Sequence, residues 1–244
     1  MSLSDADLKL LAQYDTPTIS NVIELFEVRP RSAGYMDARI RACFPEMPPI
    51  VGYASTATMR TAYARAEGAV YSSLDEQVER FADLAGPAIV VFQDLDDPAV
   101  GATFGEVMCT SYQTFGAVGI ITSGPARDLD QVRRRGFAAF SNGVVASHSY
   151  SHITSIHQPV RVGGMEVRPG DLLHADANGI CGIPLGIASE VAHAAAEFVQ
   201  AESSVMQFAD SGSRDLKGYS EARCEMLRQI EELARRLRSR AAEA

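Results

Sequence analysis

Three short apolar runs in the middle of the chain constrain its fold more than any other feature. They cover residues 88–92, 117–122 and 137–140, and each follows a glycine or a Gly-Pro pair that is typical of a turn. Compact apolar runs between turn residues predict buried strands. The segments between the runs, 105–115 and 129–135, are predicted to be helices that end at glycine. The middle of the chain therefore predicts alternating strands and helices, which indicates the α/β class.

The flanking regions predict more strands and a helical segment at each end. Thr16 is the predicted N-cap of a helix in which Pro17 takes the first position. Asn178-Gly179 is a strong hairpin-turn dipeptide within a predicted meander. We expect a single domain over residues 1–244, with terminal helical extensions suited to packing on a neighbouring subunit. The other predicted elements are a helix at 3–14, an irregular connection at 29–49, a strand at 51–61, a helix at 74–84, short strands at 159–162, 165–167, 172–175 and 180–183, and helices near 186–209 and 219–242.

Charge and composition argue against several classes of protein. The net charge of −9 argues against binding to a nucleic-acid backbone as the main function. No run of about 18 apolar residues exists, so no membrane span is expected. No signal peptide is expected at the N-terminus, and none of the four cysteines forms a CxxC pair. We therefore expect a cytoplasmic protein with free thiols and without a zinc knuckle.

The segment 104–131 is the richest in residues that can do chemistry. Gly105 stands at a predicted helix start, where free backbone N–H groups can bind an anion such as a carboxylate. The buried run 117–122 then leads into a Gly-Pro loop that presents Arg127 and Asp128. An arginine can bind a carboxylate through two parallel hydrogen bonds, and an aspartate can bind Mg²⁺. The pair therefore predicts a site for an anionic substrate and a hard cation.

Each of these residues also has an ordinary structural interpretation. Asp128 could cap the following helix, Arg127 could pair with a surface acid, and Glu106 could simply favour the first turn of its helix. His148 and His152 are four residues apart, which on a helix could bind zinc, but their stretch is polar and typical of a loop. From the residues alone, both interpretations stay open.

Several short motifs follow one another at characteristic spacings along the chain. They are DTPTISN from Asp15, FGE from Phe104, GAVGI from Gly116, GPARD from Gly124, VGGMEVRPGD from Val162, ADANG from Ala175 and Ile183-Pro184. In this order they resemble the class II pyruvate aldolases. These enzymes act on 4-hydroxy-4-methyl-2-oxoglutarate and 4-carboxy-4-hydroxy-2-oxoadipate, and their family also includes the regulator of ribonuclease E activity.

The resemblance implies a swivelling β/β/α-type central domain in a homotrimer or homohexamer with sites between subunits. It implies Mg²⁺ or Mn²⁺ held by Asp128, with Glu106 holding some of the metal's waters and Glu202 donated by the adjacent subunit. Arg127 would bind the 2-oxo oxygen, and the N–H groups after Gly105, those of Val107 and Met108, would bind the carboxylate.

The resemblance further implies a lyase that cleaves 4-hydroxy-2-oxo acids to pyruvate by a retro-aldol reaction and can decarboxylate oxaloacetate. Glu106 favours this enzyme over the ribonuclease regulators, which tend to lack an acid there. The alternative is a non-catalytic inhibitor of a ribonuclease-type partner. Three features depart from the family: Ser123 replaces a common acid, Asn21 replaces a usual Asp, and residues 142–157 do not match. The substrate could therefore differ from the two named acids.

Overall fold

A mixed sheet of eight strands forms the centre of the computed structural model, which describes residues 3–64 and 73–243. Seven strands follow the order β1-β5-β4-β3-β2-β9-β10, and β6 pairs with the second half of the long strand β2. The strands are β1 (Arg41–Ala42), β2 (Ile50–Arg60), β3 (Ala88–Asp94), β4 (Ala117–Thr122), β5 (Ala138–Ser141), β6 (His152–Ile156), β9 (Leu172–Asp176) and β10 (Gly179–Ile183).

The three apolar runs of the sequence are the parallel strands at the heart of this sheet. Strands β2, β3, β4 and β5 pair in parallel, as helical crossovers allow. In β3, Ile89 and Val91 face the inside of the curved sheet, whereas Val90 and Phe92 face the helices. Burial on both faces explains why these strands are apolar without alternation. The covering elements are α3 (Leu74–Glu79), η1 (Arg80–Asp83), α4 (Glu106–Thr114) and α5 (Leu129–Arg134).

The sheet is nearly closed because one segment touches both of its edges. At one edge, Tyr35 bridges Cys181 of β10, and the Met36 N–H donates to Ile180 O. A few residues later, β1 pairs with β5 at the other edge. The hairpin of β7 (Val160–Val162) and β8 (Met165–Val167) packs over β3 and helps to fill the interior. These features confirm the predicted α/β class, and all four short strands of the predicted meander are present.

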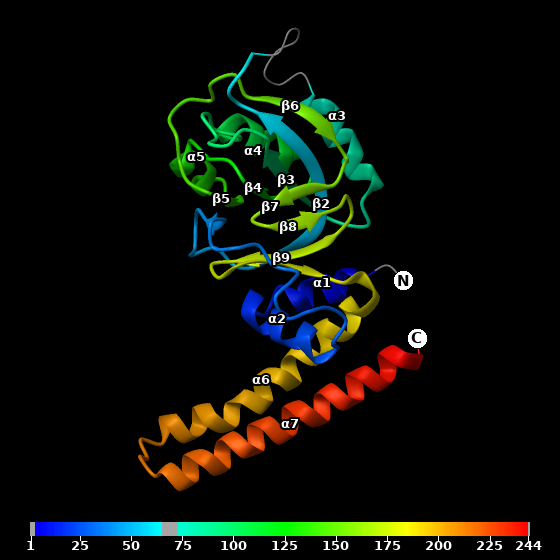
Figure 1. Ribbon diagram of the computed structural model, residues 1–244, viewed down its shortest axis with the longest axis vertical. Helices are drawn as coiled ribbons and strands as arrows, with labels where there is room; N and C mark the ends of the chain where they lie inside the picture. The colour runs from blue at the N-terminus through cyan, green and yellow to red at the C-terminus, as the bar shows by residue number, and fades with distance from the viewer. Residues whose placement is uncertain (1–2, 65–72, 244) are drawn as a thin grey trace.

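The terminal helices form a separate layer below the sheet in Figure 1. Helices α1 (Asp5–Leu11) and α2 (Thr16–Leu25) pack against β9, β10 and α6 (Ala188–Asp210), which follows η2 (Leu185–Ile187). A buried histidine ties this layer to the sheet: His174 Nε2 donates to Leu11 O at 3.1 Å, so its Nδ1 accepts from Thr16 Oγ1 at 2.8 Å. Helix α7 (Leu216–Glu243) runs back along α6, and the two project away from the body.

Three local predictions were wrong. The N-cap of α2 is Asp15, whose carboxylate accepts from the Thr18 N–H at 2.9 Å, and Thr16 is already helical. Strand β1 lies inside the expected irregular connection. Residues 152–156 form β6 because their hydroxyls bond across to β2, as between Thr58 and Ser155 at 2.6 Å. Among residues 3–64 and 73–243, no helix is long and apolar enough to cross a membrane.

Candidate functional site

The centre of the candidate site is a close approach between Gly105 and Asp128. Asp128 Oδ2 accepts a hydrogen bond from the Glu106 N–H at 3.1 Å, across 22 residues of sequence. A Cβ on Gly105 would lie 2.5 Å from this oxygen and 3.1 Å from Arg127 Nε. The backbone of Gly105 is extended, with φ −154° and ψ −170°. The position therefore requires glycine for space and not for an unusual backbone conformation.

Asp128 does not act as a conventional helix cap. It precedes α5 in the left-handed conformation (φ 58°, ψ 35°), and its side chain makes no capping hydrogen bond to that helix. The carboxylate instead turns toward α4 and lies 3.6 Å from Arg127 Nε. Both side chains stay partly exposed, at 27% for Arg127 and 35% for Asp128. The two groups are thus held together by their neighbours and remain accessible to a ligand.

A small ladder of three backbone segments holds the Arg127 loop in place. The Thr103 N–H donates to Pro125 O at 2.9 Å, and the Arg127 N–H donates to Phe104 O at 3.2 Å. On the other side, the Ala126 N–H donates to Gly143 O at 2.9 Å. Buried backbone N–H and C=O groups need hydrogen-bond partners, and this ladder supplies them. The same hydrogen bonds fix the loop on both sides. It joins the start of α4, the Arg127–Asp128 pair and the segment after β5 into one unit.

The first turn of α4 offers free N–H groups beside this pair. Glu106, Val107 and Met108 occupy its first three positions, and the N-cap residue Gly105 provides no side chain to cap them. The Glu106 N–H is taken by Asp128, whereas no partner of the Val107 or Met108 N–H occurs among the described residues. An anion can accept hydrogen bonds from such groups.

The buried Cys109 thiol lies on the same helix. Burial and the nearby Cys43 and Asp128 raise the pKa of this thiol, so it stays protonated.

The donor set suits a hydrated hard cation better than a fully protein-bound one. Asp128 and Glu106 supply carboxylate oxygens at adjacent helix starts. Among residues 3–64 and 73–243, no group of three or more His, Cys, Asp or Glu is arranged to hold a metal. Mg²⁺ keeps several waters and needs only one or two protein carboxylates. The residues present therefore fit such an ion.

Glu202 is not brought to this site within the chain. It lies on α6, which packs on α1, α2 and α7, whereas α4 packs on β4 and α5. Figure 1 shows α6 below the sheet, whereas α4 lies at the height of the strands. Burial and the nearby Asp15 carboxylate raise the pKa of Glu202. Its predicted role in a neighbouring subunit's site stays a prediction.

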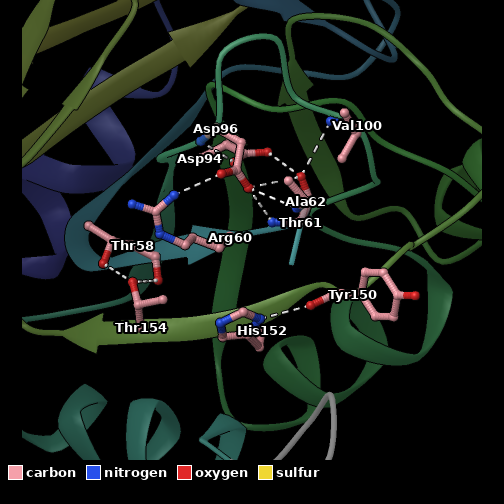
Figure 2. A network of polar contacts seen from close by, with 10 residues as sticks. All are labelled: Thr58, Arg60, Thr61, Ala62, Asp94, Asp96, Val100, Tyr150, His152 and Thr154. Carbon is pink, nitrogen blue, oxygen red and sulfur yellow. Dashed lines mark hydrogen bonds and ion pairs between the residues drawn. The ribbon is translucent and has the colours of Figure 1, made fainter. Parts of the chain in front are cut away.

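A network at the carboxyl ends of β2 and β3 supports the site and was not foreseen (Figure 2). Asp96 accepts from the Thr61 N–H at 2.6 Å and from Arg60 at 2.8 Å. The Asp94 N–H donates to Ser123 Oγ at 2.9 Å, and Asp94 packs against Gly124 in the loop that leads to Arg127. Burial and the Asp96 charge raise the pKa of Asp94. The carboxyl ends of neighbouring parallel strands lie at the same edge of a sheet. The pairing of β3 with β4 therefore explains why Asp94 and Ser123 meet.

His148 and His152 do not form the helical pair that zinc would need. His152 begins β6, and its Nδ1 lies 2.8 Å from Tyr150 O, as Figure 2 shows. His148 Nδ1 lies 2.7 Å from Ser149 O. A ring nitrogen next to a carbonyl oxygen carries the proton, so Nδ1 of neither ring is a metal ligand. The two residues also do not lie on one helical face, as the predicted zinc pair would. The predicted loop is confirmed at His148 and is wrong at His152, which begins strand β6.

Two hollows flank the Arg127 loop. One of about 530 Å³ is lined by Leu129, Val144 and residues of β1 and β5. Another of about 430 Å³ is lined by Asp94, Asp96, Ser123 and Arg161. Neither is lined by Glu106, Arg127 or Asp128, but Leu129 directly follows Asp128, so the first hollow adjoins the pair.

Comparison with known proteins gives the same picture of the fold. A family model described as RraA-like, Aldolase/RraA, matches residues 4–181. The chain is 31% identical over 103 residues to the "Putative 4-hydroxy-4-methyl-2-oxoglutarate aldolase" of Halalkalibacterium halodurans. This match covers 42% of the chain and spans about half, 49%, of that relative.

Two solved structures share the fold at 21% identity. An uncharacterized protein from Pseudomonas syringae has a TM-score of 0.69, with 91% of this chain and 99% of that chain covered. Streptomyces coelicolor RraAS2, described as an unusual member of the RNase ES inhibitor RraA protein family, has a TM-score of 0.66, with 83% and 96% covered.

Proposed function

The chain belongs to the RraA-like (Aldolase/RraA) family, and we propose that it is a divalent-metal-dependent lyase that cleaves 4-hydroxy-2-oxo acids to pyruvate. Oxaloacetate decarboxylation is a second reaction of the same site in this proposal. The observation that carries the proposal is the contact of Gly105, Glu106 and Asp128 beside Arg127. The aldolase relative supports the reaction class.

The proposed reaction uses each residue for one task. The N–H groups of Val107 and Met108 would bind the substrate carboxylate, and Arg127 would donate to the 2-oxo oxygen. As the C3–C4 bond breaks, its electron pair moves toward that oxygen, and the fixed guanidinium stabilises the developing negative charge. Asp128 and Glu106 would hold the cation, which when bound withdraws electrons from the carbonyl. The proton of the 4-hydroxyl would pass through a water at Glu106 and return to C3 of the pyruvate enolate.

A coupled assay tests the reaction class. Pyruvate release from 4-hydroxy-4-methyl-2-oxoglutarate and from oxaloacetate would be followed with lactate dehydrogenase, with Mg²⁺ and with EDTA. Because metal ions alone decarboxylate oxaloacetate, a protein-free sample with the same metal is subtracted. We expect pyruvate with Mg²⁺ and none with EDTA. Absence of pyruvate from both substrates, with every divalent metal tried, would refute the proposal.

Variants of the aspartates separate chemistry from general charge. Asp128→Asn should abolish metal-dependent activity because the cation loses its direct carboxylate. Asp130→Asn is the matched control. Asp130 is exposed in the first turn of the same helix, and its replacement by asparagine removes the same charge. Activity of the Asp130 variant should equal that of the original protein. Equal loss in both variants would point to helix α5 and not to the site.

Glu202 leads to a proposal about assembly. We propose a homotrimer or homohexamer in which Glu202 of one subunit joins the Asp128 site of the next. The packing of α6 on α1, α2 and α7, and of α4 on β4 and α5, supports this arrangement. Inactive Asp128→Asn and Glu202→Gln subunits would be unfolded, mixed and refolded together. Part of the activity should return, because some sites then combine Asp128 of one subunit with Glu202 of the other. No recovery in a mixed oligomer would refute the shared site.

The alternative function is inhibition of a ribonuclease-type partner. The fold shared with RraAS2 favours it, although that likeness concerns the fold alone. This function predicts binding of a ribonuclease that survives Asp128→Asn, together with no release of pyruvate. The assay above therefore decides between the two.

A further inference from the structure

The hollow beside Asp128 is basic in an otherwise acidic protein. It measures about 530 Å³, and its described lining includes Arg39 and Arg41 but no Asp or Glu. The chain as a whole carries a net charge of −9. Local charges set the field inside a hollow and can attract an anion against the overall charge. A hollow of this volume is in the range of small-molecule sites.

Arg41 is the arginine in this hollow that remains available. Arg39 is already neutralised by Asp37, which accepts from its Nε at 2.9 Å and from its Nη2 at 2.7 Å. Arg41 Nε donates to Ala38 O at 3.1 Å, which orients the guanidinium. In the described part of the chain, no carboxylate lies within ion-pair distance of Arg41. Arg41 is exposed, and in the described part of the chain its Nη groups make no hydrogen bond, so they can bind a carboxylate of a ligand.

The walls of the hollow are the direct neighbours of the Arg127–Asp128 pair. Leu129, on one wall, follows Asp128 in the chain. Val144, on another, bridges Ala126, the residue before Arg127. Arg41 pairs with Ser141 of β5, just before that segment. The hollow therefore adjoins the backbone that carries the Arg127–Asp128 pair, while neither side chain of the pair lines it.

We propose that Arg41 is a specificity-determining residue that binds a second carboxylate, on the fragment of the substrate that leaves as the carbonyl product. This inference rests on the proposed lyase function. Arg41 then selects 4-hydroxy-2-oxo acids that end in a carboxylate over those that end in a methyl group. Ala42 and Val144, in the same lining, leave room for a short apolar branch.

A comparison of two substrates tests the proposal. The pair is 4-hydroxy-4-methyl-2-oxoglutarate, which has the distal carboxylate, and 4-hydroxy-2-oxopentanoate, which lacks it. Loss of a charge-assisted hydrogen bond predicts that Arg41→Gln lowers kcat/KM for the first by about 10- to 100-fold. The second should change little. Arg168→Gln is the matched control, because Arg168 is an exposed arginine paired with Glu166 and lines neither hollow described above.

Calorimetric binding separates this inference from the reaction on which it rests. With Mg²⁺ present, the original protein should bind 2-oxoglutarate more tightly than 2-oxopentanoate, and Arg41→Gln should remove the difference. If the difference is present and Arg41-dependent but no pyruvate forms, the hollow is assigned correctly and the lyase proposal is wrong. If pyruvate forms but Arg41→Gln affects both substrates equally or neither, the lyase proposal stands and the role of Arg41 is refuted.

Discussion

Replacement of Gly105 by alanine should inactivate the protein without unfolding it. The added Cβ would lie 2.5 Å from Asp128 Oδ2, whereas ordinary contacts begin at 3.4 Å, so the carboxylate must move by about 0.9 Å. The Glu106 N–H would then lose a hydrogen bond to a charged acceptor, which is worth about 1.5–3 kcal/mol. A displacement of about 1 Å at a catalytic group can lower the rate by about 100-fold. We expect kcat to fall by about that factor.

The folded state should tolerate the same change. The colliding oxygen belongs to a partly exposed side chain, and alanine accepts the extended backbone of Gly105. We expect a loss of about 1.5–3 kcal/mol from the lost hydrogen bond, or about 3–12 °C in Tm, which leaves the protein folded.

Pyruvate release and thermal unfolding would be measured on Gly105→Ala and on Gly186→Ala, where an added Cβ meets nothing within 4 Å. Full activity of Gly105→Ala would refute the reasoning. The reasoning would also be refuted if thermal unfolding showed that Gly105→Ala is inactive because it is unfolded.

Three further predictions concern the site and the supporting core. Arg127→Ala should lower kcat by about 100- to 1000-fold with little change in Tm, measured by the coupled assay and thermal unfolding, because a fixed donor to developing charge is lost. Burial lowers the pKa of His174 in the folded protein, so the neutral ring stabilises the fold fully above the unfolded pKa of about 6.5. This contribution is lost as the pH falls from that value toward the lowered folded pKa. Denaturant unfolding should therefore give a smaller free energy of unfolding at pH 5.5 than at pH 7.5, and His174→Gln should reduce the difference. Tyr112→Phe removes the donor at 2.6 Å from buried Gln77 Oε1, and denaturant unfolding should show a loss of about 1–3 kcal/mol with activity retained.

The predictable part of the fold came from local patterns. The apolar runs became β3, β4 and β5, because apolar runs this short, bounded by turn residues, suit a buried strand and are too short for a typical helix. The missed strands had different causes. β6 is polar and is stabilised by hydroxyl pairs with β2, and β1 is a two-residue edge strand. Neither has an apolar period that a sequence pattern can display.

The candidate site was predictable as a set of residue types but not as a contact. The resemblance and the local chemistry singled out Arg127, Asp128 and Glu106 together with the helix start at Gly105. They left open whether Asp128 caps its own helix, and the structure shows that it does not. The positions of Arg41 beside β5 and of Asp94 beside Ser123 had no local signal, since each depends on strands that are distant in sequence.

The sequence by itself determined the helices and all strands except β1 and β6, and it determined which chemical groups follow a buried strand, because apolar periodicity and turn residues act over a few positions. Only the tertiary structure decided that Glu106 and Asp128 meet across 22 residues and that residues 34–42 join both edges of the sheet. These contacts depend on strand order and on the pairing of backbone groups over long distances. Such pairings are selected by the whole packed chain, since every buried N–H and C=O must find its partner at once.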